Sequence, residues 1–325
     1  MFAQSALEKA LHFLRQGGLV ALPTETVYGL AGNALRVETI ARIFEAKNRP
    51  FFDPLICHFA SVERIRQLIP GLTADELRLL RHFSPGPLTL LVPKPDQIPA
   101  LVTSGSPYVA VRVPNHPMAL QVLAALDFPL AAPSANPFGY ISPTTAAHVE
   151  GQLGGKVDYI LDGGPCQVGV ESTVVRLTAN QGIIYRQGGI PQEALEALLP
   201  GLAWVPASSL EPSNPTAPGA PGQLSSHYAP AKKLWLSPTP SEVPAGLDPS
   251  DAVFIGFNER STLPYKQQYL LSASGSLAEA AAALFGILHK ADAGNFTEIV
   301  ACLAPETGLG RAINDRLRRA AAKRG

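Results

Sequence analysis

Two cations one residue apart, Lys47 and Arg49, stand at the end of an apolar helical stripe in the segment AKNRPFFDPLICH, residues 46–58. On a helix, Lys47 continues the buried face of Ile43 and Phe44, so its ammonium should point inward. Two fixed cations at a helix terminus suit a polyanion. The segment by itself favours a plainer interpretation, in which Lys47 snorkels to solvent and Arg49 complements the helix dipole.

A further cation, Arg112, lies in the strictly alternating segment YVAVRVP, residues 108–114. Alternation in a strand places the three valines on one face, and Tyr108, Ala110 and Arg112 on the other. An arginine on a buried sheet needs an anionic partner. Two partners remain open, a protein carboxylate in a structural salt bridge and the carboxylate of a ligand.

Hydroxyl and amide side chains gather in the segments PSAN and ISPTT. Ser134 and Asn136 leave an expected strand in a proline-bounded loop. Ser142 is predicted to cap a helix, with Pro143 at its first position. Such a helix start suits a phosphate, although simple capping is the commoner role of one serine. A further set follows the expected strand LVALP, where α/β proteins bind ligands: Thr24, Thr26 and Tyr28.

The familiar nucleotide motifs are missing from the sequence. Gly155-Lys156 lacks the first glycine and the hydroxyl of a Walker loop, and GLGRAI lacks the third glycine of a dinucleotide-binding fingerprint. No G-x-S-x-G elbow and no metal-spaced His/Asp cluster occurs, which disfavours hydrolase and metalloenzyme functions. A bound nucleotide would therefore be held by side chains and helix N-termini.

The composition excludes a strong overall attraction to nucleic acid or membrane, because the net charge is zero and the pI is near 7.1. The last fifteen residues, RAINDRLRRAAAKRG, carry six Lys/Arg against one Asp. They could contact RNA, but a solvated helix end is favoured. Three isolated cysteines, no signal peptide and no long apolar run predict a cytoplasmic protein without a membrane span.

Helical stripes alternating with short buried strands predict an α/β domain over residues 1–205. A first helix is expected to begin at Ser5, with Glu8 as its capping-box partner. Further helices are expected over residues 37–47 and after Thr73, where Glu76 is the partner. Strands are expected near residues 19–23, 108–114, 128–136, 158–163 and 171–177.

The composition changes at residue 206, and residues 206–233 are predicted to form a linker and lid. Its first part, PASSLEPSNPTAPGAPG, has too few apolar residues to bury a core. Residues 234–325 are predicted to form a small second α/β domain, with strands AVFIGF and EIVACLAP and two helices. Tyr228, in SSHYAP, either packs passively on this second domain or belongs to a lid over the first domain. The lid is favoured, because an aromatic residue there needs a docking surface.

Seven segments resemble, in order, the motifs of the YrdC-like threonylcarbamoyl-AMP synthases over about residues 8–192. They are PTETVYGL, KNRPFFDPLICH, SPGPLTLLV, VAVRVPNHP, PSAN, GVESTVV and YRQGGI. SSHYAP and the second domain resemble the long two-domain form. The resemblance implies a twisted mixed sheet with helices, followed by a smaller Rossmann-like domain. It also implies an enzyme that makes threonylcarbamoyl-AMP and pyrophosphate from L-threonine, bicarbonate or CO₂, and ATP, for threonylcarbamoyladenosine modification of tRNA next to the anticodon.

The resemblance also implies roles for particular residues. Lys47 and Arg49 would be catalytic, with Mg²⁺ accompanying ATP and no metal held by the protein alone. The threonine-binding residues would be Thr26, His58, Arg112 and Ser172. The ATP-binding residues would be Arg49, Asp53, Ser134, Asn136, Ser142, Arg186 and Tyr228.

Three positions depart from the family pattern. Asp53 stands where Asn is frequent, and a carboxylate near phosphate is tolerable only through Mg²⁺ or a hydroxyl. Tyr108 stands where Thr is common, and Ala132 lacks a hydroxyl that could contact threonine. Tyr108 and Ala132 are therefore not assigned to the site.

Two other functions remain as alternatives. A carbamoyltransferase of the hydrogenase-maturation kind contains a similar domain, but three isolated cysteines leave no zinc fingers for it. A double-stranded RNA or tRNA-binding module would use a concave basic face, which zero net charge disfavours. The implied partners are the three substrates, a tRNA-modifying transferase that accepts the intermediate, and tRNA through a weak contact.

Overall fold

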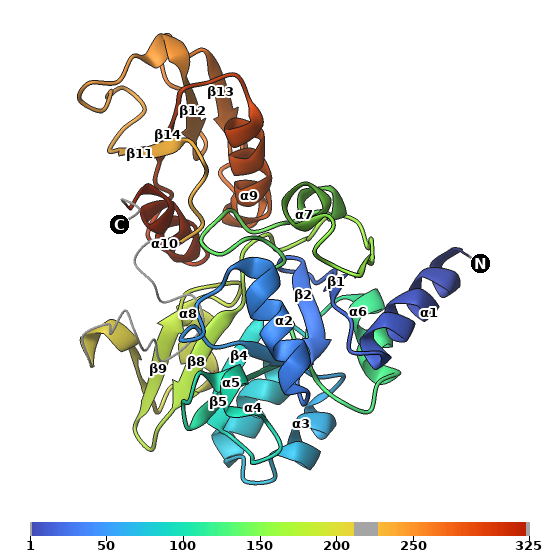
Figure 1. Cartoon of the computed structure of the whole chain (residues 1–325). Helices are drawn as coiled ribbons and strands as arrows, with labels where there is room; N and C mark the ends of the chain where they lie inside the picture. Colours follow the sequence, from blue (N-terminus) through green and yellow to red (C-terminus); the bar gives the residue numbers. More distant parts are fainter. Residues whose placement is uncertain (1, 211–226, 323–325) are drawn as a thin grey trace.

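A computed structural model describes residues 2–210 and 227–322, which form a larger N-terminal domain and a smaller C-terminal domain (Figure 1). The larger domain is built on a ten-stranded mixed sheet in the order β10-β9-β8-β4-β5-β3-β6-β2-β1-β7. Its strands are β1 (Val20–Leu22), β2 (Gly29–Asn33), β3 (Ile56–His58), β4 (Leu88–Pro93), β5 (Tyr108–Arg112), β6 (Leu130–Ala131), β7 (Tyr159–Ile160), β8 (Thr173–Leu177), β9 (Gln181–Arg186) and β10 (Ala203–Pro206).

Helices cover both faces of this sheet. Strand alternation sends Ala21 of β1 into the main core, while Val20 and Leu22 pack against α1 and α6 on the other face. The remaining helices of the domain contribute side chains to the main core. The helices are α1 (Phe2–Arg15), α2 (Val37–Lys47), α3 (Val62–Leu68), α4 (Ala74–Phe83), α5 (Ala100–Thr103), α6 (Pro117–Ala124), α7 (Ala146–Leu153) and α8 (Gln192–Leu198).

The C-terminal domain is a four-stranded, wholly parallel sheet in the order β11-β14-β12-β13. Apolar side chains on one face of the sheet pack on two helices, and those on the other face are covered by loops. The elements are β11 (Lys233–Ser237), β12 (Ala252–Gly256), β13 (Gln267–Leu270), α9 (Leu277–Ala293), β14 (Glu298–Cys302) and α10 (Gly310–Ala321), with short 3₁₀ turns at Ala207–Ser209 and Pro249–Asp251. The predicted fold class, a mixed α/β sheet plus a smaller α/β domain, is confirmed.

One apolar cluster contains residues of both domains. Val27, Ile141 and Val170 of the larger domain lie in the same cluster as Phe285 and Leu288 of α9. In Figure 1 the lower ends of α9 and α10 face the larger domain, and α7 lies beside α9. The C-terminal domain is therefore packed on the larger domain rather than merely tethered to it.

The local signals for helix starts were correct in one case and wrong in two. Thr73 and Glu76 form the predicted capping box at the start of α4. Ser5 lies inside α1, which already begins at Phe2, so it does not cap that helix. Ser142 is also not a helix cap, because α7 begins at Ala146 and its cap is Thr145. Ser142 has another partner, described below.

The predicted linker is covered only in part. Residues 211–226 lie outside the described residues, so the predicted lid formed by that segment stays a prediction. β10 extends to Pro206 and β11 begins at Lys233, close to the predicted domain boundaries at 205 and 234. Within residues 2–210 and 227–322, no helix combines the length and the apolar composition that a membrane span requires.

Candidate active site

A buried cavity of about 50 Å³ lies where the β1–β2 loop, β3, β5 and the entry to β8 meet residues 227–228. Its walls carry hydroxyl, imidazole, guanidinium and carboxylate groups. The lining residues are Thr26, Val27, Arg49, Pro54, Ile56, His58, Arg112, Ala132, Pro133, Ser134, Glu171, Ser172, Arg186, His227 and Tyr228. The predicted threonine residues therefore lie in one cavity with several of the predicted ATP residues.

Arg112 lines this cavity from the last position of β5. Its Nη2 donates to Glu25 Oε1 at 2.7 Å and to Thr26 Oγ1 at 3.0 Å, and its Nε donates to the carbonyl of Gly86. The second oxygen of Glu25 accepts from the backbone N–H of Asn115. The salt bridge left open by the sequence is thus present, and the same guanidinium also faces the cavity.

The lysine and arginine at the end of α2 are both buried. Lys47 is 1% exposed, and its Nζ donates to the backbone carbonyls of Ser134 and Asn136. The snorkelling interpretation is therefore wrong, because the ammonium is turned into the protein. Burial, and then the charge of Arg49, lower the pKa of Lys47 well below its usual value. α2 ends because Asn48 is left-handed, with φ of 50°, so the helix stops before Pro50.

Arg49 is held by Asp53. The guanidinium Nη2 lies 2.8 Å from Asp53 Oδ2, and it donates to the carbonyl of Pro54 at 2.9 Å. Both side chains are buried, and the ring of Phe138 lies 5.8 Å from the guanidinium carbon. Asp53 does not line the cavity, so in this structure its carboxylate lies behind Arg49.

Ser172 and Arg186 form the adjoining wall. Ser172 Oγ is 2.7 Å from Thr89 Oγ1 and accepts from Arg186 Nη2 at 3.1 Å. Arg186 also donates twice to the carbonyl of Ser172. Burial lowers the pKa of Arg186 from its ordinary value, although a guanidinium remains charged at neutral pH.

Glu171 connects the cavity to both domains. Ser142 Oγ donates to Glu171 Oε1 at 2.6 Å, and Arg316 Nε of α10 donates to Glu171 Oε2 at 2.8 Å. Burial opposes ionisation of Glu171, but the charges of Arg316 and Arg186 prevail and hold its pKa below the usual value. The predicted capping role of Ser142 is replaced by this contact.

Residues 227–229 run between the two domains. The backbone N–H of His227 donates to the carbonyl of Arg319 in α10, and that of Ala229 donates to the carbonyl of Gly139. The Tyr228 ring, 1% exposed, packs 5.6 Å from Phe285 of α9 while lining the cavity. Tyr228 therefore packs on the second domain, as one alternative held, and it also lines the cavity, whereas the lid stays a prediction.

The two imidazoles of the cavity are neutral at neutral pH. Burial, and then the nearby Arg112, lower the pKa of His58 to about 3. Burial, and then Arg49 and Lys47, lower the pKa of His227 well below its usual value. Because the two imidazoles are neutral, the positive charge of the cavity lining lies on its arginines.

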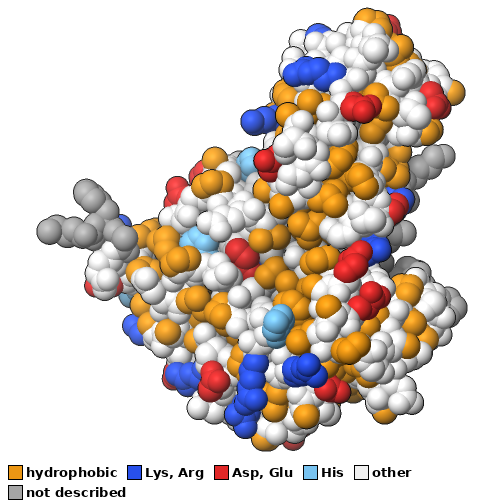
Figure 2. Space-filling model, turned by 180° about the vertical axis from the view of Figure 1, so that it is seen from behind, with side chains coloured by type: hydrophobic (Ala, Val, Ile, Leu, Met, Phe, Trp, Pro, Cys, Tyr) orange, Lys and Arg blue, Asp and Glu red, His pale blue; other side chains and the backbone are white. Residues whose placement is uncertain are grey.

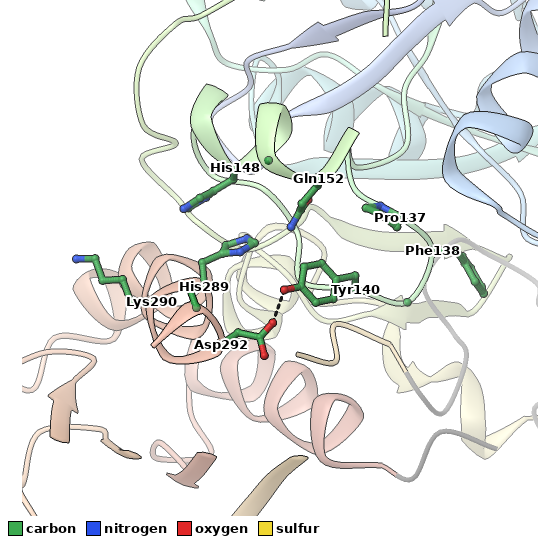
Figure 3. A pocket seen from close by; sticks show the side chains of 11 residues that line it. Pro137, Phe138, Tyr140, His148, Gln152, His289, Lys290 and Asp292 are labelled. Carbon is green, nitrogen blue, oxygen red and sulfur yellow. Dashed lines mark hydrogen bonds between the residues drawn. The ribbon is translucent and has the colours of Figure 1, made fainter. Parts of the chain in front are cut away.

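A larger hollow of about 1080 Å³ lies between the domains, next to this cavity. Figure 3 shows His148 and Gln152 of α7 facing His289 and Asp292 of α9, with Tyr140 hydrogen-bonded to Asp292. The rings of His148 and His289 stack at 3.9 Å between centroids. The hollow and the cavity are neighbours, because Phe138 of the hollow contacts His227 of the cavity.

Several residues of this region were not singled out from the sequence. Glu25, Glu171 and His227 could have been found, because they lie inside the family-like motifs PTETVYGL, GVESTVV and SSHYAP. Arg316 gave no signal, because it belongs to a basic helix end that was expected to be solvated. That expectation is wrong for Arg316, which is fully buried. On the face drawn in Figure 2, acidic and basic side chains are interspersed, without an extended basic surface.

The fold and the site define a class of protein, in which a mixed α/β sheet holds an arginine-rich cavity. The family model for the Sua5, YciO and YrdC proteins, described as telomere recombination, matches residues 12–188. A second model, described as the threonylcarbamoyl-AMP synthase C-terminal domain, matches residues 190–322.

Individual relatives match nearly the whole chain. The threonylcarbamoyl-AMP synthase of Pyrococcus abyssi is 38% identical over 323 residues, covering 97% of this chain and 94% of the relative. That of Bacillus subtilis is 36% identical, covering 98% and 93%. The crystal structure of P. abyssi Sua5 complexed with L-threonine has a TM-score of 0.87 at 36% identity, covering 98% and 94%. The chain therefore belongs to the YrdC-like threonylcarbamoyl-AMP synthase family, in its long two-domain form.

Proposed function

We propose that this protein makes threonylcarbamoyl-AMP and pyrophosphate from L-threonine, bicarbonate or CO₂, and ATP. The observation that carries the proposal is that all four residues expected to bind threonine, and four of the seven expected to bind ATP, line one cavity of a chain that matches a threonylcarbamoyl-AMP synthase over 97% of its length. Asp53, Asn136 and Ser142 do not line it. The product would be passed to a tRNA-modifying transferase for threonylcarbamoyladenosine formation. Because that reaction acts on tRNA, we place the protein in the cytoplasm.

In the proposed site, threonine is bound by Thr26, His58, Arg112 and Ser172. Arg112 holds the threonine carboxylate, since a guanidinium binds a carboxylate through two N–H groups. Its Nε and Nη2 already donate to protein groups, whereas among the described residues none accepts a hydrogen bond from its Nη1. The N–H groups of Nη1 are therefore available to a ligand carboxylate, which supports this role. ATP is bound by Arg49, Asp53, Ser134, Asn136, Ser142, Arg186 and Tyr228.

The chemistry requires positioning and charge screening rather than a covalent nucleophile. The threonine amine attacks CO₂ and loses a proton, which gives a carbamate. A carbamate oxygen then attacks the α-phosphorus of ATP, and the bond from that phosphorus to the bridging oxygen breaks to release pyrophosphate. Two anions must approach each other, so buried cations lower the barrier by stabilising the developing charge. Lys47 and Arg49 are proposed for this task, because both are buried and fixed at the end of α2.

Mg²⁺ is proposed to arrive with ATP rather than to be bound by the protein alone. Of the carboxylates nearest the cavity, Asp53 is paired with Arg49 and Glu171 with Arg316. Within the described ranges no three His, Cys, Asp or Glu side chains are grouped as a metal site. When bound to the phosphates, Mg²⁺ would supply additional charge screening.

The proposed reaction also requires the site to open. Ligand cavities for molecules of this size are usually about 300–1,000 Å³. A cavity of about 50 Å³ is too small for ATP. Because His227 contacts Phe138, which lines the interdomain hollow, we infer that the cavity opens toward that hollow when ATP enters.

A direct assay tests the proposed function. The protein is incubated with ATP, Mg²⁺, bicarbonate and L-threonine, and pyrophosphate and the adenylate are followed by mass spectrometry. We expect both products, and neither when L-threonine is left out. Lys47→Met, which keeps the side chain's length but removes its charge, should form the adenylate at least tenfold more slowly. Pyrophosphate release that does not depend on threonine would overturn the proposal, and salt-dependent RNA binding without turnover would favour the RNA-binding alternative.

A further inference from the structure

One arginine of the C-terminal domain is buried at the edge of the cavity. Arg316 lies on α10, and its side chain is 0% exposed. Among the described residues it has the largest fully buried side chain. A guanidinium is rarely buried unless it is paired, because removing its charge from water is costly. The charge of Arg316 therefore needs anionic partners, and one of them lies in the other domain.

The partner is Glu171, which lines the cavity. Arg316 Nε donates to Glu171 Oε2 at 2.8 Å, and Arg316 Nη1 donates to Asp315 Oδ2 at 2.6 Å. The other oxygen of Glu171 accepts from Ser142. The next residue, Ser172, holds Arg186. Arg316 of α10 is thus linked to Glu171 directly, and through the neighbouring Ser172 to Arg186 in the adjoining wall.

The same guanidinium also supports Tyr228. The Arg316 guanidinium carbon lies 5.0 Å from the centroid of the Tyr228 ring, within the range of a cation–π contact. Tyr228 has a positive φ of 64°, which is an uncommon conformation for a residue with a large side chain. Such a conformation persists only where the surroundings fix it, and Arg316 and Phe285 provide that packing.

Arg316 has one N–H group that no local contact uses. Among the described residues, none accepts a hydrogen bond from its buried Nη2. A buried donor is normally paired, so an unpaired one needs an explanation beyond local packing. A charge placed at the edge of an anion-binding cavity is such an explanation.

We propose that Arg316 acts as a positioning residue for the adenylation reaction. Arg316 orients Glu171 and Tyr228, so that the C-terminal domain contributes to the active site. This inference rests on the proposed function. It gives the C-terminal domain a task, because without α10 the buried carboxylate of Glu171 loses its ion-pair partner and the Tyr228 ring loses one of its supports.

The test compares Arg316→Ala and Arg316→Lys with Arg318→Ala, a matched control. Arg318 is on the same helix, but it is half exposed and pairs with Glu306 away from the cavity. We expect Arg316→Ala to lower kcat and raise the KM for ATP, so that kcat/KM for ATP falls ten- to a hundredfold. The KM for L-threonine should change less, because the proposed threonine residues keep their contacts. Arg316→Lys should recover part of the loss, and Arg318→Ala should match the wild type.

The pH profile provides a readout that a purely structural role would not move. Burial, Arg186 and Ser142 still act on Glu171 in Arg316→Ala, but its strongest cationic partner is gone, so its pKa rises. The acid limb of kcat/KM should therefore move to higher pH in Arg316→Ala. Adding Glu171→Gln to Arg316→Ala should cost less than the product of the two single effects, because no unpaired buried carboxylate remains.

The outcomes separate the two proposals. If wild-type protein makes no threonylcarbamoyl-AMP, the proposed function fails. If the wild type is active and Arg316→Ala melts at lower temperature with unchanged kinetics and pH profile, the positioning role is overturned. If Arg316→Ala does not fold, Arg316→Lys decides: a raised KM for ATP supports the role, and wild-type kinetics overturn it.

Discussion

At the scale of single residues, the site is built from charges that the fold has removed from water and paired. Arg49 with Asp53, Arg112 with Glu25 and Arg316 with Glu171 are all buried pairs. Such pairs contribute little net stability compared with apolar residues of similar size, but breaking one leaves a costly unpaired charge. Each pair therefore fixes a guanidinium in or beside the cavity.

Arg112→Ala should weaken L-threonine binding far more than ATP binding. A lost charge-assisted contact to a carboxylate is worth roughly 1.5–3 kcal/mol, about ten- to a hundredfold in affinity. The variant should also unfold more easily, because it leaves Glu25 buried without its cation. Calorimetric titration of each ligand and a thermal melt measure the two effects.

The double variant Arg112→Ala with Glu25→Gln separates these effects. It should recover much of the lost stability while threonine affinity stays low. Recovery of threonine binding together with stability would mean that Arg112 serves only the salt bridge.

The residues of the site differ in how far the sequence reveals them. Arg112 stands out because a cation on an otherwise apolar strand needs an anionic partner, and it is buried against one. Lys47 and Arg49 also stand out, but their segment alone favoured solvent-exposed charges, and both are buried. The partners Glu25 and Glu171 could not be assigned, because pairing depends on contacts between residues distant in the sequence. Arg316 is the extreme case, since it lies 145 positions from Glu171.

At the scale of elements, helix starts are set by local side-chain contacts, and one of them can be tested simply. Thr73→Ala removes the hydroxyl that accepts from the Glu76 backbone in the capping box of α4. It should cost about 1 kcal/mol of unfolding free energy with kcat unchanged. Urea unfolding and a steady-state assay check both. Ser5→Ala is the matched control, because Ser5 lies inside α1 and should show no capping loss.

The helices α7 and α9 meet through a pair of stacked histidines that should make the domain junction sensitive to acid. Burial, and then His148, lower the pKa of His289 to about 4, and burial, and then Lys290, lower that of His148. Below pH 6.5 the unfolded chain binds protons that the folded protein does not, so stability present above pH 6.5 is lost as pH falls toward 4. Asp292 and Tyr140 also face the pair (Figure 3).

His289→Gln should flatten part of this pH dependence. Between pH 7 and 5 the wild type should lose on the order of 1–2 kcal/mol more unfolding free energy than the variant. His58, whose pKa is also low, contributes equally to both proteins and cancels in the comparison. Parallel stability curves for the two proteins would show that His289 does not carry the effect.

Elements with a clear period were predictable, whereas those fixed by tertiary contacts were not. α2 spans the predicted residues 37–47, and α9 and α10 follow their apolar stripes. β2 was missed because its sequence, GLAGN, has two glycines and no strand signal. It forms because it lies between β1 and β6, where pairing and burial override propensity.

At the scale of the whole molecule, the active site depends on how closely the two domains approach. Gly169, just before β8, has φ of +73°, and a Cβ there would lie 2.5 Å from the Ala281 carbonyl oxygen and from the Ala282 Cα of α9. Both neighbours are helix backbone, which cannot yield without moving the helix. Gly169 is therefore the point at which the larger domain allows close contact with α9.

Gly169→Ala should push α9 away from the larger domain. The left-handed conformation alone costs about 1–2 kcal/mol, and the clash adds about 1–3 kcal/mol. Because α9 carries Phe285 against Tyr228, adenylate formation should fall at least tenfold, and calorimetry should show the two domains unfolding in separate steps. Gly105→Ala is the matched control, since Gly105 has φ of +80° with open space around a Cβ, so it should lose stability but keep its activity. If Gly169→Ala keeps full activity, or if both variants lose it equally, close contact between the domains is not what completes the site.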